Sequence, residues 1–369
     1  MQKLILVIVL FLLIGRSSVF AQDKQVAPEQ KFYKAVVEQI VESGQKTVEN
    51  QIFYYQTLRV KILDGSMKGK FTIIQNGKDV QINKDQLVSK GQEIIVSKTI
   101  FPNGTSSYSI YDYYRLNNLL ITLAIFFIAI IIVAGAKGFG SILGMLVSLG
   151  IITFYILPNI LKGQDPLTIT LIGSCVILVL TTYLAHGISK KTTVAIASTL
   201  ISLFLAAAFS ILAIKFNTIT GLGNEDAFTL QIGSTSIIDL KGLFLSAIII
   251  GTLGALNDVT TTQAATVYEL KKTDIKLKFE ALFVKSLNIG KEHIASLINT
   301  LILAYVGSSF AVFIFLLLNP NHLPYWVIFN NEIISDEIIK IVAGSFGLLL
   351  SVPIVTFIAS LVFEKEKFS

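Results

Sequence analysis

Long apolar stretches, separated by short polar connections, fill the chain from residue 113 to its end at residue 369. A helix of about 20 apolar residues spans the roughly 30 Å of bilayer hydrocarbon and satisfies its own backbone hydrogen bonds there. The stretches therefore predict a mainly α fold, a polytopic membrane bundle of about seven transmembrane helices. Their expected spans are 116–134, 139–157, 166–184, 194–214, 240–256, 294–318 and 338–363.

The lysines between these spans fall on alternate connections, which indicates how the chain crosses the membrane. One set of connections is rich in lysine, whereas the other carries fewer lysines together with several acidic residues. Because lysine-rich connections stay in the cytoplasm, residues 22–112 are expected outside it and the C-terminus inside. The lysines expected in the cytoplasm are Lys137, Lys190, Lys191, Lys271, Lys272, Lys276, Lys278, Lys285, Lys291, Lys365 and Lys367.

Residues 1–21 have the pattern of a secretory signal. Lys3 precedes an apolar core from Leu4 to Ile14, and the small-residue pattern Val19-Phe20-Ala21 follows. This arrangement predicts cleavage before Gln22, and an uncleaved anchor is the alternative. Lys3 favours a cytoplasmic N-terminus in both cases, so the following segment is exported.

Residues 22–112 predict a small exported domain with a helical start and a β-rich remainder. Up to Gln51 the apolar residues have helical spacing, whereas later ones alternate with polar residues and approach turn pairs such as Asp64-Gly65 and Asn76-Gly77. The alternation favours a small β-barrel or sandwich. Binding an extracytoplasmic protein partner, gating a pore and packing on the membrane part all stay open as its role. The expected helical face consists of Phe32, Val36, Val37, Ile40 and Val41.

The composition agrees with a membrane protein and excludes several functions. With 53% apolar and 15% charged residues, the chain cannot bury all its apolar surface in one soluble core. The net charge of +6 comes mostly from lysines that flank apolar spans, so it indicates orientation and no nucleic-acid partner. Cys175 is the sole cysteine, and neither a nucleophile elbow nor a His-Glu-x-x-His pair occurs. We therefore expect no enzyme, no cofactor and no metal site.

A glycine-containing stretch with one carboxylate is the part of the spans that most suggests function. On a helix, Gly251, Gly254 and Asp258 share one face, and Glu269 follows further on. A carboxylate at this depth is costly unless it is paired, hydrated or protonated, which suits proton or cation coupling. The alternative is that Asp258 lies at the cytoplasmic end of its span and caps a following helix.

The sixth span offers a second polar face, expected in the same half of the membrane. Asn299 and Thr300 lie on or beside this face, and Glu292 lies at its cytoplasmic entrance. An Asn within a span needs a hydrogen-bond partner, which is either cargo or another helix. We therefore hypothesise that Asp258 and Asn299 belong to one substrate or ion site.

Small residues recur at intervals of four on several spans. Gly140, Gly144 and Ser148 lie on the second span, and Ser198 and Ser202 lie on the fourth. This spacing lets membrane helices approach closely. Helix packing is the simpler interpretation, and a cavity or pore lined by the hydroxyls is the alternative.

Several motifs of the chain occur together in a known family. They are Gly254-Ala255-x-x-Asp258, Glu269, Gly290-x-x-x-Ile294 and the stretch NTLILAYVG from Asn299 to Gly307. In these motifs the chain resembles the YibE/F family of bacterial multi-pass membrane proteins. The resemblance implies a bacterial plasma-membrane protein, of a kind often supposed to be a permease.

Two functional classes follow from these features. The first is a transporter or permease for a small solute or ion, with its polar site near Asp258 and Asn299 and the lipid bilayer around it. The second is a membrane scaffold or sensor that transports nothing and binds an extracytoplasmic partner through residues 22–112. An intramembrane enzyme is the least favoured reading. A polar, water-filled path through Asp258 would favour transport, whereas a dry bundle with a capped Asp258 would favour the scaffold.

Overall fold

The computed structural model describes residues 29–48, 51–78, 81–101, 104–223, 229–230, 238–319 and 322–366. Contacts divide the chain into two compact units, with the boundary between Ala129 and Ile130. The predicted signal segment, the turn residue Asn103, the acidic residues Glu225 and Asp226, and Lys367 lie outside the described residues.

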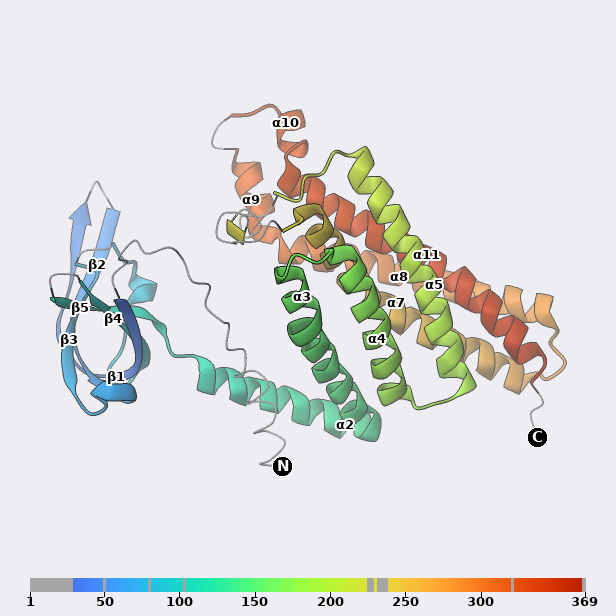
Figure 1. Ribbon diagram of the computed structural model, residues 1–369, viewed down its shortest axis with the longest axis horizontal. Helices are drawn as coiled ribbons and strands as arrows, with labels where there is room; N and C mark the ends of the chain where they lie inside the picture. The colour runs from blue at the N-terminus through green and yellow to red at the C-terminus, as the bar shows by residue number, and fades with distance from the viewer. Residues whose placement is uncertain are drawn as a thin grey trace. The chain divides into compact units, whose positions relative to one another are not determined.

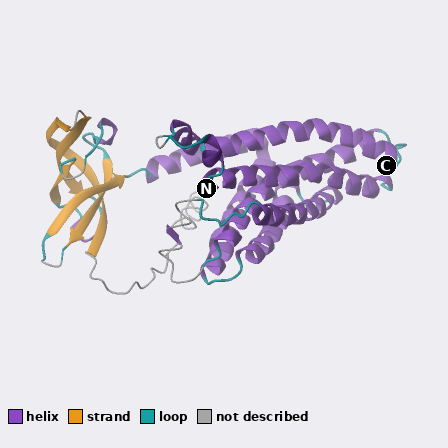
Figure 2. Ribbon diagram, turned by 90° about the horizontal axis from the view of Figure 1, so that it is seen from above, coloured by secondary structure: helices purple, strands orange, loops and turns teal. Residues whose placement is uncertain are grey.

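The first unit contains an antiparallel sheet of five strands (Figure 2). The long strand β1 (Glu29–Val48) lies at its centre and pairs with β2 (Gln51–Ile62) and β4 (Glu93–Ile100). Strand β2 pairs with β3 (Phe71–Asn76), and β4 pairs with β5 (Ser106–Tyr113). The edge strands β3 and β5 approach each other, with no ladder between them among the described residues. The sheet therefore curls into a partly open barrel.

Alternating apolar residues fill this barrel. Val60 and Ile62 on β2, and Ile94 and Val96 on β4, are fully buried, as the side-chain period of two in a strand requires. Short 3-10 turns at Gly65–Met67 and Lys84–Gln86 lie in the connections. The predicted β-rich N-terminal domain is confirmed.

The predicted helical start of this domain is wrong, because Glu29–Val48 form strand β1. Tyr33, Ala35 and Val37 are buried at a period of two, whereas Phe32 and Val41 are about half exposed. The alternation ends where register shifts interrupt the pairing with β2, between Val37 and Gln39 and again between Ile40 and Glu42. Such bulges change the face of the sheet on which the following side chains lie. The apolar residues of β1 therefore have a spacing that resembles that of a helix.

The rest of the chain is helical (Figure 1). The bounds are α2 (Leu116–Ile151), a π-helical turn (Ile152–Ile156), α3 (Leu157–Leu161), α4 (Pro166–His186), α5 (Lys190–Phe216), α7 (Leu240–Thr273), α8 (Phe279–Ser308), α9 (Phe310–Leu318), α10 (Tyr325–Phe329) and α11 (Glu332–Glu364). The chain is thus mainly helical, as predicted.

Side-chain caps determine where several helices begin. The Asp165 carboxylate accepts a hydrogen bond from the Thr168 amide at 2.8 Å, directly before Pro166 at the first position of α4. The Ser189 hydroxyl accepts one from the Thr192 amide at 3.2 Å at the start of α5. These caps satisfy amides that have no partner inside the helix.

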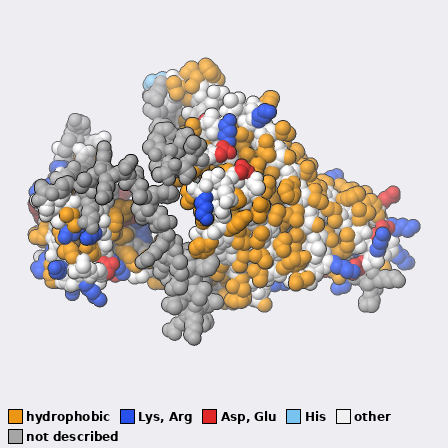
Figure 3. Space-filling view, in the orientation of Figure 1, with side chains coloured by type: hydrophobic (Ala, Val, Ile, Leu, Met, Phe, Trp, Pro, Cys, Tyr) orange, Lys and Arg blue, Asp and Glu red, His pale blue; other side chains and the backbone are white. Residues whose placement is uncertain are grey.

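Helices α5, α7 and α11 pack against one another at the centre of the second unit, with α8 on α11 and α4 on α7. The central core includes Leu203, Leu256 and Val352, each almost fully buried. Large apolar side chains are also exposed on the outside of this unit, which Figure 3 shows as broad hydrophobic areas. An exposed apolar exterior of this extent is expected of helices that face lipid.

Among the described residues, five helical runs are long and apolar enough to cross a membrane, or six if the bent pair α8 and α9 counts as one span. The first run, Leu116–Leu161, contains 46 residues and has a non-helical backbone at Gly135, with φ 56° and ψ −136°. The axes of α8 and α9 differ by 71°. The predicted count of seven crossings stays a prediction.

Because β1 is a strand and not a helix, substitutions at Val37 and Val41 should affect stability differently. On a helix Val37 and Val41 would share a face, but here Val37 is 1% exposed and Val41 is 56% exposed. We expect Val37→Asp to abolish cooperative unfolding of the barrel, because an unpaired buried carboxylate is highly unfavourable. Val41→Asp should shift stability by no more than about 0.5 kcal/mol. Thermal melts and limited proteolysis of both variants check this, and equal damage from both would contradict the strand.

Candidate functional site

A cavity of about 550 Å³ lies in the helical unit between α2, α4 and α7. Gly144 and Gly254 contribute to its wall without side chains. At its end, Gly140 lets α2 approach α4 closely, because an added Cβ there would lie 2.5 Å from the Leu184 carbonyl oxygen. The polar residues that line the cavity are Ser141, Ser148, Thr181, His186, Asn257 and Asp258.

Asp258 lies in the interior of α7, which continues without a break to Thr273. A residue in this position caps no helix end, so the capping alternative is wrong. In the part of the chain that the structure describes, its carboxylate has no hydrogen-bond or ion-pair partner. The only other titratable side chain among the described residues that line the cavity is His186, at the end of α4. Asp258 is therefore available to a ligand or to water in the cavity.

Asn257 directly precedes Asp258 on α7 and also lines the cavity. Its side-chain oxygen lies 2.8 Å from the Thr182 hydroxyl of α4, and its backbone carbonyl accepts a hydrogen bond from Thr261 at 2.8 Å. Asn257 is not among the site residues predicted from the sequence. The sequence indicates a role for Asn257 only in that this amide lies next to a carboxylate within an otherwise apolar span. The contact with Thr182 in the structure shows that the amide is held in place.

The two glycines predicted beside Asp258 have different roles. Gly254 lines the cavity and would tolerate a Cβ, since no atom lies within 4 Å of that position. Gly251 faces α8 instead, where an added Cβ would lie 2.9 Å from the Tyr305 hydroxyl. Gly254 thus widens the cavity, whereas Gly251 makes room for a packed tyrosine.

The other predicted site residues lie away from this cavity. Asn299, Thr300 and Glu292 are exposed on α8, and the described lining of the cavity includes none of them. The Thr300 hydroxyl bonds its own helix at the Ser296 carbonyl, at 3.0 Å. The inward face of α8 passes through Ile294 and Leu301, and a helix turns about 100° per residue. Asn299 therefore faces away from the core.

Glu269 belongs to a separate hollow, further along α7. Its carboxylate lies 3.6 Å from the Lys191 ammonium group and its side chain is exposed. The hollow of about 590 Å³ is lined by Glu269, Thr262 and Thr266, and it shares His186 with the Asp258 cavity. His186 is the residue that the two hollows have in common.

A buried polar junction connects α7, α8 and α11. The Gln263 side-chain nitrogen lies 2.8 Å from the Ser286 carbonyl and 2.9 Å from the Thr356 hydroxyl. Gly290 is required beside it, because an added Cβ would lie 2.4 Å from a methyl group of Val352. Satisfied polar contacts of this kind hold membrane helices together. We interpret the junction as structural.

The loop after α5 is tied to the start of α11. The Glu332 carboxylate accepts hydrogen bonds from the amides of Thr220 and Gly221, at 2.7 and 2.9 Å, and from the Thr220 hydroxyl. Asp336 of α11 lies against Gly223 of this loop. A Cβ added at Gly223 would clash with the Asp336 carboxylate. These contacts close one end of the bundle.

The cavity predicts which engineered thiols react with water-soluble reagents. In a Cys175→Ser background, Asp258→Cys and Gly254→Cys should react with a cationic methanethiosulfonate, because both positions line the cavity. Val259→Cys should stay unreactive, since Val259 is 1% exposed. Labelling rates measured by mass spectrometry check this. A labelling rate at position 258 no higher than that at the buried position 259 would contradict access of water to the cavity.

Comparisons with known proteins agree with the resemblance of the sequence motifs. The family model described as YibE/F-like protein matches residues 122–365, which include the whole cavity. Neither the search of curated proteins nor the search of solved structures found a match. Because this match covers more than half of the chain, the chain belongs to the YibE/F-like family.

Proposed function

We propose that this protein is a transporter for a small solute or ion, with Asp258 as the binding residue of its cavity. The observation that carries the proposal is an unpartnered carboxylate that faces an open polar cavity within a bundle of apolar helices. Carboxylates in membrane helices are unfavourable, and they recur on the pathways of protons, ions and substrates. Membership of the YibE/F-like family supports a membrane protein.

The lining favours a small cationic ligand or a proton. Asp258 supplies the negative charge, and the hydroxyls of Ser148 and Thr181 supply neutral oxygen atoms. The described lining contains neither lysine nor arginine, which an anionic solute would need.

We further infer seven crossings in a bacterial plasma membrane, with residues 22–112 outside the cytoplasm and the C-terminus inside. The backbone at Gly135 leaves the helical region, so the run Leu116–Leu161 divides there into two helices. At 1.5 Å per residue the first part approaches the roughly 30 Å of hydrocarbon and the second exceeds it. With α8 and α9 as one bent span, this division gives the predicted number of crossings, and the lysine-rich connections are then expected in the cytoplasm.

Removal of the Asp258 charge should eliminate ligand binding and transport. We expect a thermal-shift screen against Na⁺, K⁺, H⁺ and small amines to identify a ligand that stabilises the wild type and leaves Asp258→Asn unchanged. At a hundredfold excess over Kd a ligand stabilises a protein by about 2.7 kcal/mol. The same ligand should then be taken up by proteoliposomes of the wild type only.

Glu269→Gln is the matched control, because it removes a carboxylate from the same helix at an exposed position paired with Lys191. It should bind and transport like the wild type. If Asp258→Asn retained both binding and uptake, the proposal would lose its central residue.

The orientation predicts which side of the membrane each unit faces. In the Cys175→Ser background, an impermeant maleimide should label Ser43→Cys in intact spheroplasts, because Ser43 is exposed on the barrel. Lys272→Cys, in the last turn of α7, should be labelled only after permeabilisation. Gel-shift labelling measures both, and the reverse pattern would invert the topology.

A further inference from the structure

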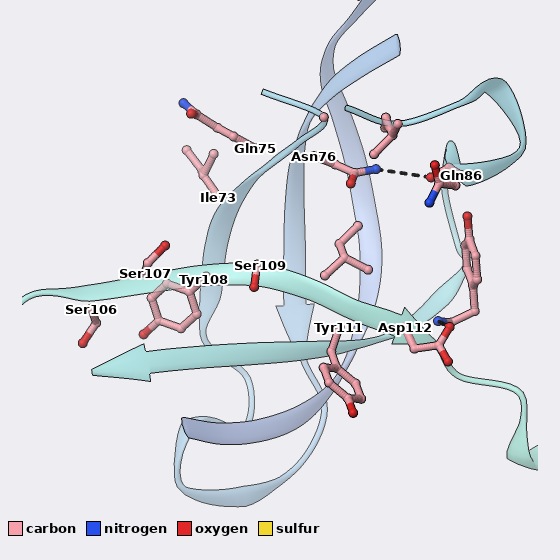
Figure 4. Close-up of a pocket in the computed structure, with 14 residues that line it drawn as sticks. Ile73, Gln75, Asn76, Gln86, Ser106, Ser107, Tyr108, Ser109, Tyr111 and Asp112 are labelled. Atoms are coloured by element: carbon pink, nitrogen blue, oxygen red, sulfur yellow. Dashed lines mark hydrogen bonds between the residues drawn. The ribbon is translucent and has the colours of Figure 1, made fainter. Parts of the chain in front are cut away.

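The open seam of the barrel forms a groove between β3 and β5 (Figure 4). Its volume of about 760 Å³ lies within the range of small-molecule and cofactor sites. On β5, Tyr108 and Ile110 point inward and pack on the barrel core. The exposed residues that alternate with them on β5, and the exposed residues of β3, face outward along the groove. These exposed residues are Ile73, Gln75, Ser107, Ser109 and Tyr111.

The spacing of the two edge strands limits what the groove can hold. A peptide inserted between them as an additional strand would need roughly 9.5 Å, which is twice the usual distance between paired strands. Cα atoms of β3 and β5 instead come within 8 Å of each other. An inserted strand therefore does not fit, and a ligand must bind to the side chains along the seam.

The lining offers neutral hydrogen-bonding groups. Hydroxyls of Ser107 and Ser109 lie on β5, and amides of Gln75 and Asn76 lie on β3. Among the described residues that line the groove there is no lysine or arginine. Nucleic acids and other polyanions bind through such cations, so the groove does not suit them.

The single described carboxylate of the groove is already neutralised. Asp112 accepts hydrogen bonds from the Tyr113 amide and from the Arg115 guanidinium, both at 2.7 Å. The amide and then the guanidinium hold the pKa of this exposed carboxyl below its ordinary value. A ligand in the groove therefore meets no uncompensated charge among the described lining residues.

One aromatic ring completes the surface. Tyr111 is 65% exposed, and its ring packs against that of Phe32 in a T-shaped arrangement, with the ring centroids 4.8 Å apart and the ring planes at 67°. The contact orients the ring on the protein surface while most of it stays open. A rigid tyrosine of this kind offers a large contact area at low cost in conformational entropy.

We propose that the groove between β3 and β5 binds a neutral oligosaccharide. The apolar C–H face of one sugar ring stacks on Tyr111, and hydroxyls of neighbouring sugars exchange hydrogen bonds with Gln75, Ser107 and Ser109. Neutral amides, hydroxyls and an open ring match a polyhydroxylated chain in both polarity and charge. This site lies outside the transport cavity and in the domain predicted to be exported, where it would meet glycans of the cell envelope.

The test uses the full chain in lipid nanodiscs, because detergents with sugar headgroups would compete for the groove. Biotinylated chitohexaose, cellohexaose and maltohexaose are immobilised as probes, and binding is followed by biolayer interferometry. We expect at least one of them to bind the wild type, and Tyr111→Ala and Gln75→Ala each to weaken that binding by about tenfold or more. Tyr111→Phe should retain it, since the ring and its contact with Phe32 remain.

Gln45→Ala is the matched control, because Gln45 is also exposed on the barrel and lies outside the described lining of the groove. It should bind as the wild type does. Failure of all three hexasaccharides to bind overturns the proposal, as does equal binding to the wild type and Tyr111→Ala. Binding of an uncharged alanine–serine hexapeptide or of an oligothymidine in their place overturns it as well. None of these outcomes depends on whether Asp258 transports a solute.

Discussion

The close approach of α5, α7 and α11 is the constraint on which the rest of the helical unit depends. Helices in lipid gain no hydrophobic free energy from one another, so they associate where small residues permit extensive backbone contact. At Gly347 an added Cβ would lie 3.0 Å from the Cβ of Ala206 and 3.1 Å from a methyl group of Thr252. The buried hydroxyls of Ser198 and Ser202 donate to carbonyls of their own helix, at 2.8 and 2.9 Å. Packing therefore explains these small residues, and a hydroxyl-lined pore through them does not.

The Asp258 cavity differs from this packed centre in a way that matters for function. In the centre, hydroxyls are buried and most have a backbone partner within the helix, whereas Asp258 faces open volume between α2, α4 and α7. Gly140 brings α2 against α4, and Gly144 and Gly254 leave space beside that contact. Small residues thus serve packing on one side of α7 and create a cavity on the other. Whether a small residue packs a contact or widens a cavity depends on which helices surround it.

The two units expose opposite kinds of side chain on their surfaces. The barrel buries apolar residues at a period of two and exposes lysines and glutamates, as an aqueous domain does. The helical unit exposes large apolar side chains over much of its exterior and buries many of its hydroxyls. Binding at the barrel seam and transport through the bundle are consequently independent proposals, each with its own residues and its own chemistry.

The sequence by itself determined the membrane class and the β-rich N-terminal domain, and it identified Asp258 as an isolated carboxylate, because hydrophobic length, alternation and a single charge in an apolar span are local features. It mistook β1 for a helix, since bulges near Val37 and Ile40 alter the alternation and only pairing with β2 reveals them. Only the tertiary structure decided that Asn299 faces away from the core while Asn257 is held by Thr182. The same holds for the groove, because β3 and β5 meet only when the sheet curls. Such contacts join residues far apart in the chain, and no local pattern encodes the rotation of one helix or strand against another.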